Sequence, residues 1–391
     1  MSNINSETVL KVKNLKVMFA SDRGMIRSVE GVDLEVHKGE CVALVGESGC
    51  GKSVTSLTIM GLRNEPPCIW KADQLDLNIN GQMVSLMGKT EKELQDIRGK
   101  YISMVFQDPM TCLNPVMTCG AQIDEVFLRH QKDDMQQEIN AVKEQKQALQ
   151  AKAKQLKEEG KADEAAQVAK EAKSIRVPKL KDVARQRSIS ALKAVNVPSP
   201  EKRYKDYPHQ LSGGKRQRVM IAMAYACRPS FMIADEPTTA LDVTIQAQVL
   251  ELMNGLRRCN DTGLLLITHD LSVVANMAEE IYVMYSGKIV EKATTDELFD
   301  NPLHPYTRGL IGSIPKLAGK HGDRFVQIPD NVPHPTMKPK GCYFNPRCAY
   351  ATDKCREVMP PLETLESGRQ VRCWNYKVLQ EEDQKKKKGG N

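Results

Sequence analysis

The segment GESGCGKS, residues 46–53, has the composition and spacing of a loop that binds phosphate groups. It fits the pattern G-x-x-x-x-G-K-[ST], follows the apolar run CVALV and precedes a helix-compatible stretch. Its glycines let the backbone curl until successive N–H groups point at phosphate oxygens, and the helix N-terminus adds partial positive charge. We expect Lys52 to reach the β- and γ-phosphates of a nucleotide and the Ser53 hydroxyl to bind Mg²⁺. The predicted binding residues here are Gly46, Glu47, Ser48, Gly49, Cys50, Gly51, Lys52, Ser53 and Val54.

A second chemical motif, FMIADEP at residues 231–237, ends an apolar run with two acids. Open α/β sheets bind ligands at the carboxyl ends of their strands, where such acids would lie. We therefore expect Asp235 to hold Mg²⁺ through water. Glu236 would act as the general base that polarises an attacking water.

The elements that must position these motifs are strands and helices in alternation. Residues 9–45 alternate as strands do, and later apolar runs are separated by helical patterns. This order predicts an α/β fold with a mostly parallel, helix-covered sheet. The runs expected to form its buried strands are residues 41–45, 101–106, 231–235 and 264–268.

Residues 131–182 interrupt this alternation. They are rich in Gln, Lys, Glu and Ala, which are strong helix formers, and Gly160 is a plausible turn. The segment predicts an antiparallel helical hairpin with a thin apolar seam. Two interpretations remain open for it: a solvated surface insertion, or an arm that docks a partner.

Composition limits the class of protein. Hydrophobic residues make up 41% and charged residues 27%, and no apolar run approaches the roughly 18–20 residues that span a bilayer. The first residues lack the basic and apolar regions of a signal peptide, so we expect a cytoplasmic protein. Part of the net charge of +7 comes from KKKK at 385–388, and we expect no nucleic-acid partner.

The segment LSGGKRQRV at 211–219 lies between the two motifs described above. The phosphate loop, LSGG, ADEPTTALD and ITHD, in this order, closely resemble the ATP-binding subunits of ABC transporters. The resemblance covers residues 9 to about 300 apart from the 131–182 insertion. It implies an ABC-type P-loop NTPase with a RecA-like parallel sheet core, antiparallel edge strands and a helical subdomain.

The resemblance also implies a pair of subunits. Ser212, Gly213 and Gly214 would form a second phosphate cradle, at a helix N-terminus. In this family that cradle caps the γ-phosphate of ATP held by the opposite subunit, head to tail. ATP binding would then close the pair, and hydrolysis would open it.

Further site residues follow by motif match. Gln107 in VFQDP would sense Mg²⁺ and the attacking water, and His269 in ITHD would contact the γ-phosphate. Asp242 would cross the subunit interface and help to align the water. Phe19 is a candidate for stacking on adenine, although an aromatic residue at a strand end is as often part of the core.

Several sequence segments narrow the resemblance to one branch of the ABC transporter family. FQDPMTCLNPVMT, IADEPTTALDVTIQAQVLELM, NPLHPYTRGLIGSIP and the C-terminal GCYFNPRC pattern look like the ATPases of dipeptide and oligopeptide importers. That branch implies a different second ATPase subunit, two membrane permeases, a solute-binding protein and a peripheral position on the cytoplasmic face of the membrane. The alternatives are a soluble ABC ATPase acting on ribosomes or DNA, and a scaffold protein with an inactive site.

The C-terminal part carries a cluster of cysteines. Eleven cysteines without a secretion signal argue against a disulfide framework and favour metal or redox ligands. The cluster has no C-x2–4-C pair typical of zinc, and the resemblance implies a 4Fe–4S cluster, with zinc or reduced structural cysteines as alternatives. In the phosphate loop, Cys50 is expected to favour its thiolate beside the loop N–H groups. The clustered residues are Cys342, Cys348, Cys355 and Cys373.

These patterns predict a domain order. We expect the nucleotide-binding core in two parts, with a helical subdomain between them, then a small cysteine-containing domain and a disordered basic tail. The predicted ranges are 1–100 and 226–300 for the core, 101–225 for the helical subdomain with its insertion at 131–182, 301–378 for the C-terminal domain and 379–391 for the tail.

Overall fold

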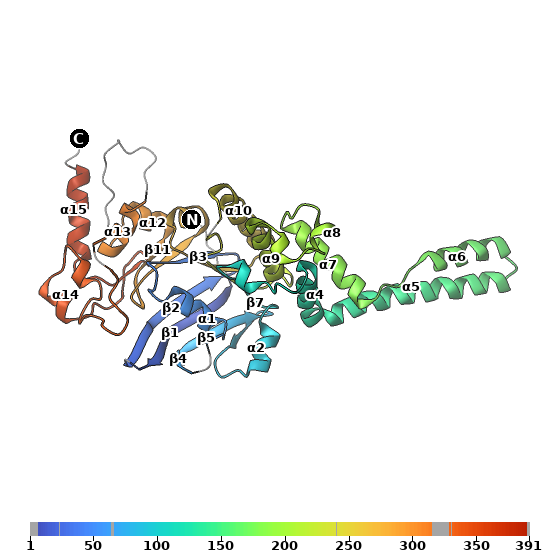
Figure 1. Cartoon of the computed structure of the whole chain (residues 1–391), viewed down its shortest axis with the longest axis horizontal. Helices are drawn as coiled ribbons and strands as arrows, with labels where there is room; N and C mark the ends of the chain where they lie inside the picture. The colour runs from blue at the N-terminus through green and yellow to red at the C-terminus, as the bar shows by residue number, and fades with distance from the viewer. Residues whose placement is uncertain are drawn as a thin grey trace. The chain divides into compact units, whose positions relative to one another are not determined.

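The structure, a computed structural model, describes residues 7–22, 24–63, 66–239, 241–314, 328–329 and 331–388, without the side chains of 383–388 (Figure 1). The described residues form two compact units. The core unit comprises the residues up to Asp108 and those from Arg228 onward, and the helical unit comprises Pro109–Cys227.

The larger sheet of the core unit runs in the order β12-β13-β11-β10-β3-β9-β8-β7. The strands from β10 to β7 are parallel, and those from β11 to β12 join one edge antiparallel. Every residue of the central strands is buried, as expected for a sheet covered on both faces. The strands are β3 (Cys41–Val45), β7 (Ile102–Val105), β8 (Phe231–Asp235), β9 (Gly263–Thr268), β10 (Glu280–Tyr285), β11 (Lys288–Thr294), β12 (Glu363–Thr364) and β13 (Gln370–Val371).

The register of the parallel strands aligns their carboxyl ends. Val45 of β3 pairs with Thr268 of β9, and Asp235 of β8 pairs with Ile267 of β9. The residues that follow these strands therefore emerge at one edge of the sheet. The predicted α/β fold with a parallel core and antiparallel edge strands is confirmed.

A smaller antiparallel sheet is formed by the residues around β1. Its long first strands alternate buried and partly exposed residues over much of their length, which confirms the strand pattern predicted for residues 9–45. β1 pairs with β2, β4 and β5, and β5 pairs with β6. The strands are β1 (Thr8–Ser21), β2 (Gly24–His37), β4 (Cys68–Lys71), β5 (Gln74–Ile79) and β6 (Gln82–Ser85).

Helices of the core unit follow or precede the strands of the larger sheet. No helix among the described residues is long and apolar enough to cross a bilayer. The helices are α1 (Lys52–Ile59), α2 (Glu91–Ile97), α10 (Val243–Asn260), α11 (Leu271–Met277), α12 (Thr295–Asp300), α13 (Pro305–Gly312), the 3₁₀ turn η2 (Asn345–Arg347), α14 (Asp353–Glu357) and α15 (Tyr376–Lys388).

The helical unit contains the predicted hairpin, which Figure 1 shows as α5 and α6 side by side. Gly160 has a φ of 79° in the turn between them, a conformation that favours glycine. Only Ala165 and Ala172 of α6 are buried, which confirms the thin apolar seam. The helices are α3 (Pro109–Cys112), α4 (Cys119–His130), α5 (Lys132–Glu158), α6 (Ala162–Ser174), α7 (Leu180–Ala194), α8 (Pro200–Arg203), the 3₁₀ turn η1 (Pro208–Gln210) and α9 (Gly213–Tyr225).

The C-terminal segment, from Asn301 onward, is part of the core unit, so the separate small domain that we predicted is not confirmed. Its strand β13 extends the larger sheet by pairing with β11. In the described residues α15 continues to Lys388, into the range predicted as a disordered tail, and the tail beyond it stays a prediction. Leu379 of this helix is fully buried, and Lys, Glu and Gln favour helix beyond it.

A buried ion pair fixes the C-terminal segment to the sheet. Nη2 of Arg369 lies 3.0 Å from Oε1 of Glu291 on β11 and donates to the Asn301 carbonyl oxygen at 2.8 Å. Glu291 is fully buried and accepts the N–H groups of Leu303 and His304, both at 2.8 Å. Burial raises the pKa of the Glu291 carboxyl, so this charge depends on its partners.

We predict that Arg369→Met lowers the free energy of unfolding by about 3–5 kcal/mol, because it leaves the Glu291 charge buried without its cation. Urea denaturation would measure the loss. The control is Arg356→Met, which removes an exposed ion pair with Asp353 and should cost less than about 1 kcal/mol. Equal losses in the two variants would contradict the assigned role of the buried pair.

Candidate functional site

The phosphate loop joins β3 to α1, as predicted, and is shaped by its glycines. A Cβ atom at Gly46 would lie 2.2 Å from the Met284 carbonyl oxygen, at the end of β10. At Gly51, φ is 113° and a Cβ would lie 2.6 Å from the Ser28 carbonyl oxygen. Only glycine fits these positions without moving the neighbouring backbone, so β2 and β10 support the loop from behind.

Lys52 is buried and lies over its own loop. Its Nζ donates hydrogen bonds to the carbonyl oxygens of Gly46 at 2.6 Å and Glu47 at 3.1 Å. A lysine held inside the curl of such a loop is placed to meet phosphate oxygens there. Ser48, Gly49 and Ser53 are exposed, which leaves this side of the loop accessible.

Asp235 and Ser53, the two residues predicted to bind Mg²⁺, lie in contact with each other. The Ser53 hydroxyl donates to Oδ1 of Asp235 at 3.2 Å. Burial raises the pKa of Asp235, and the neighbouring charge of Glu236 raises it further, while the Ser53 hydrogen bond opposes the shift. A hydroxyl and a carboxylate in contact are the oxygen donors that Mg²⁺ prefers, so these residues fit the ion.

Glu236 is the centre of a hydrogen-bond network. Its carboxylate accepts from Nε2 of Gln107 at 3.0 Å and from the Thr239 hydroxyl at 3.1 Å, and lies 3.2 Å from Nδ1 of His269. Glu236 has a φ of 47°, which is rare for a residue other than glycine and is typical of functional sites. The structure thus brings together Gln107, Glu236 and His269, which sequence reasoning placed in one site.

Thr239 was missed by sequence reasoning. It lies in the TTALD phrase, three residues before Asp242. Its hydroxyl fixes the same carboxylate oxygen of Glu236 that Gln107 contacts. One sequence feature indicates this contact: Thr239 follows Glu236 by three positions, a separation over which a turn brings side chains together.

Other predicted residues lie at helix ends or strand ends. Asp242 caps α10 by accepting the Ile245 N–H at 2.9 Å, so it has a local structural role. Phe19 is half-buried, with the guanidinium carbon of Arg63 5.9 Å from its ring centroid. Its stacking on adenine, and the role of Asp242 across an interface, stay predictions.

The second predicted cradle lies in the helical unit. Ser212 is the N-cap residue of α9 and makes no side-chain capping hydrogen bond, and Gly213 begins the helix. Ser212 and Gly213 are exposed. The hydroxyl and the first N–H groups of the helix are thus arranged as an anion-binding helix terminus, and the partner-subunit role stays a prediction.

Residues of the C-terminal segment contact the phosphate loop, and sequence reasoning missed them. The Glu47 N–H donates to the Tyr306 hydroxyl at 2.8 Å. The Glu47 carboxylate forms an ion pair with Arg347, with N···O distances of 2.7 and 3.0 Å. No sequence signal links residues 300 positions apart.

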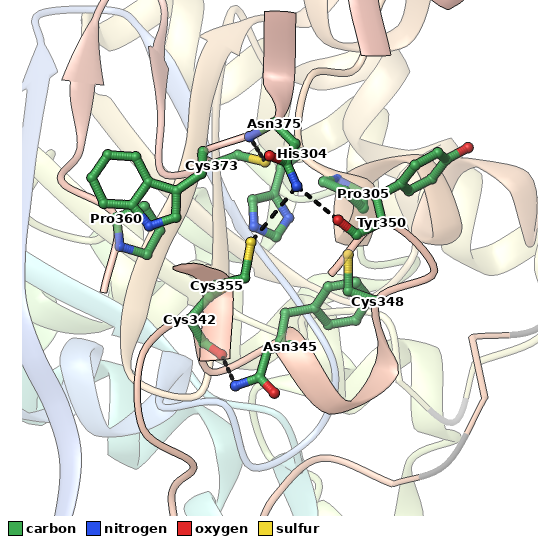
Figure 2. Close-up of a pocket in the computed structure, with 12 residues that line it drawn as sticks. His304, Pro305, Cys342, Asn345, Cys348, Tyr350, Cys355, Pro360, Cys373 and Asn375 are labelled. Carbon is green, nitrogen blue, oxygen red and sulfur yellow. Dashed lines mark hydrogen bonds between the residues drawn. The ribbon is translucent and has the colours of Figure 1, made fainter. Parts of the chain in front are cut away.

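The four late cysteines line one pocket with a volume of about 10 Å³, which we call the cysteine pocket (Figure 2). Figure 2 shows Cys348, Cys355 and Cys373 around this pocket with Asn375 beside them. The Asn375 N–H donates to Sγ of Cys373 at 3.4 Å. Burial, together with a smaller effect of the neighbouring thiols, raises the pKa of Cys342 to about 11 and that of Cys373 to about 12.

The predicted metal centre is not supported by this arrangement. Among the described residues, no group of three or more His, Cys, Asp or Glu side chains is placed to hold a metal ion. The volume of about 10 Å³ is room for about one water molecule. The spacing of the four cysteines in the sequence predicts correctly that their thiols meet at one pocket. The thiols are not arranged there as the ligands of a metal ion.

The predicted thiolate at Cys50 is wrong. Cys50 is 1% exposed, and burial raises the pKa of its thiol although the Lys52 charge opposes the shift. Its side chain packs on the inner side of the loop, where a Cβ at Gly46 would lie 2.9 Å from Sγ. Burial therefore outweighs the loop N–H groups.

We predict that a thiol reagent at pH 7 modifies the exposed Cys112 and Cys259 well before Cys50. Peptide mass mapping after brief alkylation measures the order of modification. Alkylation in denaturant is the control, because unfolding exposes Cys50 and should make the rates similar. Labelling of Cys50 as fast as Cys112 in the folded protein would contradict this expectation.

Comparisons with known proteins agree with this geometry. Residues 29–239 match the family model described as ABC transporter, and residues 290–355 match that of the oligopeptide/dipeptide transporter C-terminal region. The chain is 46% identical over 369 residues to the oligopeptide transport ATP-binding protein AppD of Bacillus subtilis (strain 168), covering 94% of this chain and 97% of that protein.

Further similar proteins include one from a different organism and one of known structure. The dipeptide transport ATP-binding protein DppD of Escherichia coli (strain K12) is 42% identical over 365 residues, covering 93% of this chain and 96% of that protein. The solved dimer of an ATP-binding cassette in a post-hydrolysis state with ADP and Pi has a TM-score of 0.53 at 23% identity, covering 73% of this chain and 98% of that chain. At that identity the likeness concerns the fold.

Proposed function

This chain belongs to the ABC transporter family of ATP-binding proteins, and we propose that it drives the import of di- and oligopeptides. As a family member it is an ATPase whose hydrolysis is coupled to transport. The observation that carries the assignment is the network around Glu236, beside the Asp235–Ser53 pair and the phosphate loop. The peptide substrate is supported by the similarity to the Bacillus subtilis oligopeptide protein over 94% of this chain.

In the proposed mechanism, Lys52 and the loop N–H groups hold the β- and γ-phosphates of ATP. Ser53 and Asp235 would hold Mg²⁺, which when bound would supply positive charge that stabilises the transferred phosphoryl group. Glu236 accepts a proton from the attacking water, and its three hydrogen-bond partners fix the direction of its carboxylate. His269 would then contact the γ-phosphate.

The proposed assembly is a head-to-tail pair of ATPase subunits. Ser212, Gly213 and Gly214 would cap the γ-phosphate of ATP in the other subunit, since they begin α9 and Ser212 and Gly213 are exposed. The second subunit would be a different ATPase. The remaining proposed partners are two membrane permeases and, through them, a solute-binding protein, with this chain on the cytoplasmic face of the membrane.

We predict that Glu236→Gln nearly abolishes ATP turnover and peptide uptake while ATP stays bound, because an amide cannot accept the proton. The measurements are ATPase activity and labelled-peptide uptake by the complex purified with its permeases. Glu251→Gln changes an exposed glutamate on α10 and is the matched control. Undiminished ATP turnover in Glu236→Gln would refute the role of Glu236 as the general base. ATP turnover without peptide uptake in the wild type would refute peptides as the transported substrate.

We also propose, separately, that the cysteine pocket binds an iron–sulfur cluster, with zinc as the alternative metal. The four thiols that line this one pocket support the proposal. We predict about four iron and four sulfide per chain after anaerobic purification, and loss of both in Cys348→Ser. Stoichiometric zinc would favour the alternative, and protein without metal would refute both.

A further inference from the structure

We propose that Arg347 and Tyr306 are positioning residues that hold the phosphate loop in its ATP-binding shape. The C-terminal segment thereby sets how tightly this chain binds ATP. The inference rests on the proposed function only in taking the loop as the ATP site. It concerns residues that contact the loop, not the nucleotide.

The link from Arg347 to the loop is a bidentate ion pair. Nη1 and Nη2 of Arg347 donate to the two carboxylate oxygens of Glu47 at 2.7 and 3.0 Å. The Arg347 side chain is 2% exposed and that of Glu47 is 29% exposed, so water screens this pair only in part. A planar guanidinium that meets both oxygens fixes the direction of the carboxylate as well as its charge.

Arg347 cannot easily turn away from Glu47, because its other contacts hold it. Its Nε donates to the Pro329 carbonyl oxygen at 2.7 Å. Its guanidinium carbon lies 5.9 Å from the ring centroids of both Tyr285 and Phe344. Tyr285 ends β10, so the arginine is packed against the same strand end that supports the loop from behind.

Tyr306 fixes the backbone at the same residue. Its hydroxyl accepts the Glu47 N–H at 2.8 Å, and its ring packs edge-on against Tyr285 with centroids 4.7 Å apart. Tyr306 is fully buried at the start of α13. The first residue after Gly46 is therefore held at its backbone by Tyr306 and at its side chain by Arg347.

The charge of Glu47 gives this arrangement a consequence for ATP. The carboxylate belongs to a loop that must accept a triphosphate, and Arg347 neutralises it. The Glu47 carbonyl oxygen also accepts from Nζ of Lys52 at 3.1 Å, so a displaced Glu47 would displace this contact of the lysine. Without Arg347, the negative carboxylate is unpaired beside the phosphates and the start of the loop is less fixed.

The closing experiment compares Arg347→Met with Arg369→Met in the purified transporter complex. Both changes remove a buried arginine that anchors the C-terminal segment, but only Arg347 contacts the loop. We expect Arg347→Met to raise the KM for ATP about tenfold or more with kcat changed less than about threefold, since it weakens binding before the chemical step. Arg369→Met should lower the unfolding midpoint and leave KM within about twofold of the wild type.

Further variants separate positioning from folding. Arg347→Lys keeps the charge without the bidentate geometry and should recover part of the loss, and Tyr306→Phe should raise KM about threefold with the fold retained. Adding Glu47→Gln to Arg347→Met should lower KM again, because it removes the unpaired charge.

The proposal is overturned if Arg347→Met and Arg369→Met change KM equally, or if Tyr306→Phe and Arg347→Lys both bind ATP as the wild type does. If Arg347→Met fails to fold, the KM values of Tyr306→Phe and Arg347→Lys test the proposal instead. Each of these outcomes is measured relative to the active wild-type complex. The Glu236→Gln experiment tests the proposed function separately, so failure of that function is distinguishable from failure of the positioning proposal.

Discussion

The parallel pairing of β3 with β9, and of β9 with β8, is the constraint on which the site depends. It places the ends of these strands in register, with Val45 opposite Thr268 and Asp235 opposite Ile267. The phosphate loop and the acids of β8 therefore emerge at the same edge. Because side chains alternate between the faces of a strand, a shift of one residue in β8 would exchange the directions of Asp235 and its neighbour. The hydrogen-bond network of Glu236 exists only in this register.

Much of this arrangement could be predicted from local sequence. The apolar runs of β3, β8 and β9 are buried on both faces, so their composition alone identifies them as central strands. The motifs follow their strands directly, and parallel strands share an edge, which agrees with the meeting of Gln107, Glu236 and His269 that the family resemblance predicts. The helical hairpin was predictable for a similar reason, since its helix formers and Gly160 act within the segment itself.

The remainder depends on tertiary contacts that composition does not encode. Thr239 reaches Glu236 only because the backbone of Glu236 turns with a φ of 47°. Cys50 was expected to be a thiolate from its loop, but its burial against the strands behind decides its pKa. The separate C-terminal domain was inferred from a change in composition, whereas pairing of β13 with β11 makes this segment part of the core unit. The contact of Arg347 with Glu47 spans 300 residues and left no local pattern.

That last contact has a consequence for how the protein is made. Chains are synthesised from the N-terminus at about 5–20 residues per second, so roughly 15–60 s separate the emergence of Glu47 from that of Arg347. Strand β10, whose end supports the loop, is also translated late. A nascent chain therefore carries the full phosphate-binding motif long before the contacts that shape it exist. The order of translation therefore delays the completed nucleotide pocket until residues up to Arg347 have left the ribosome.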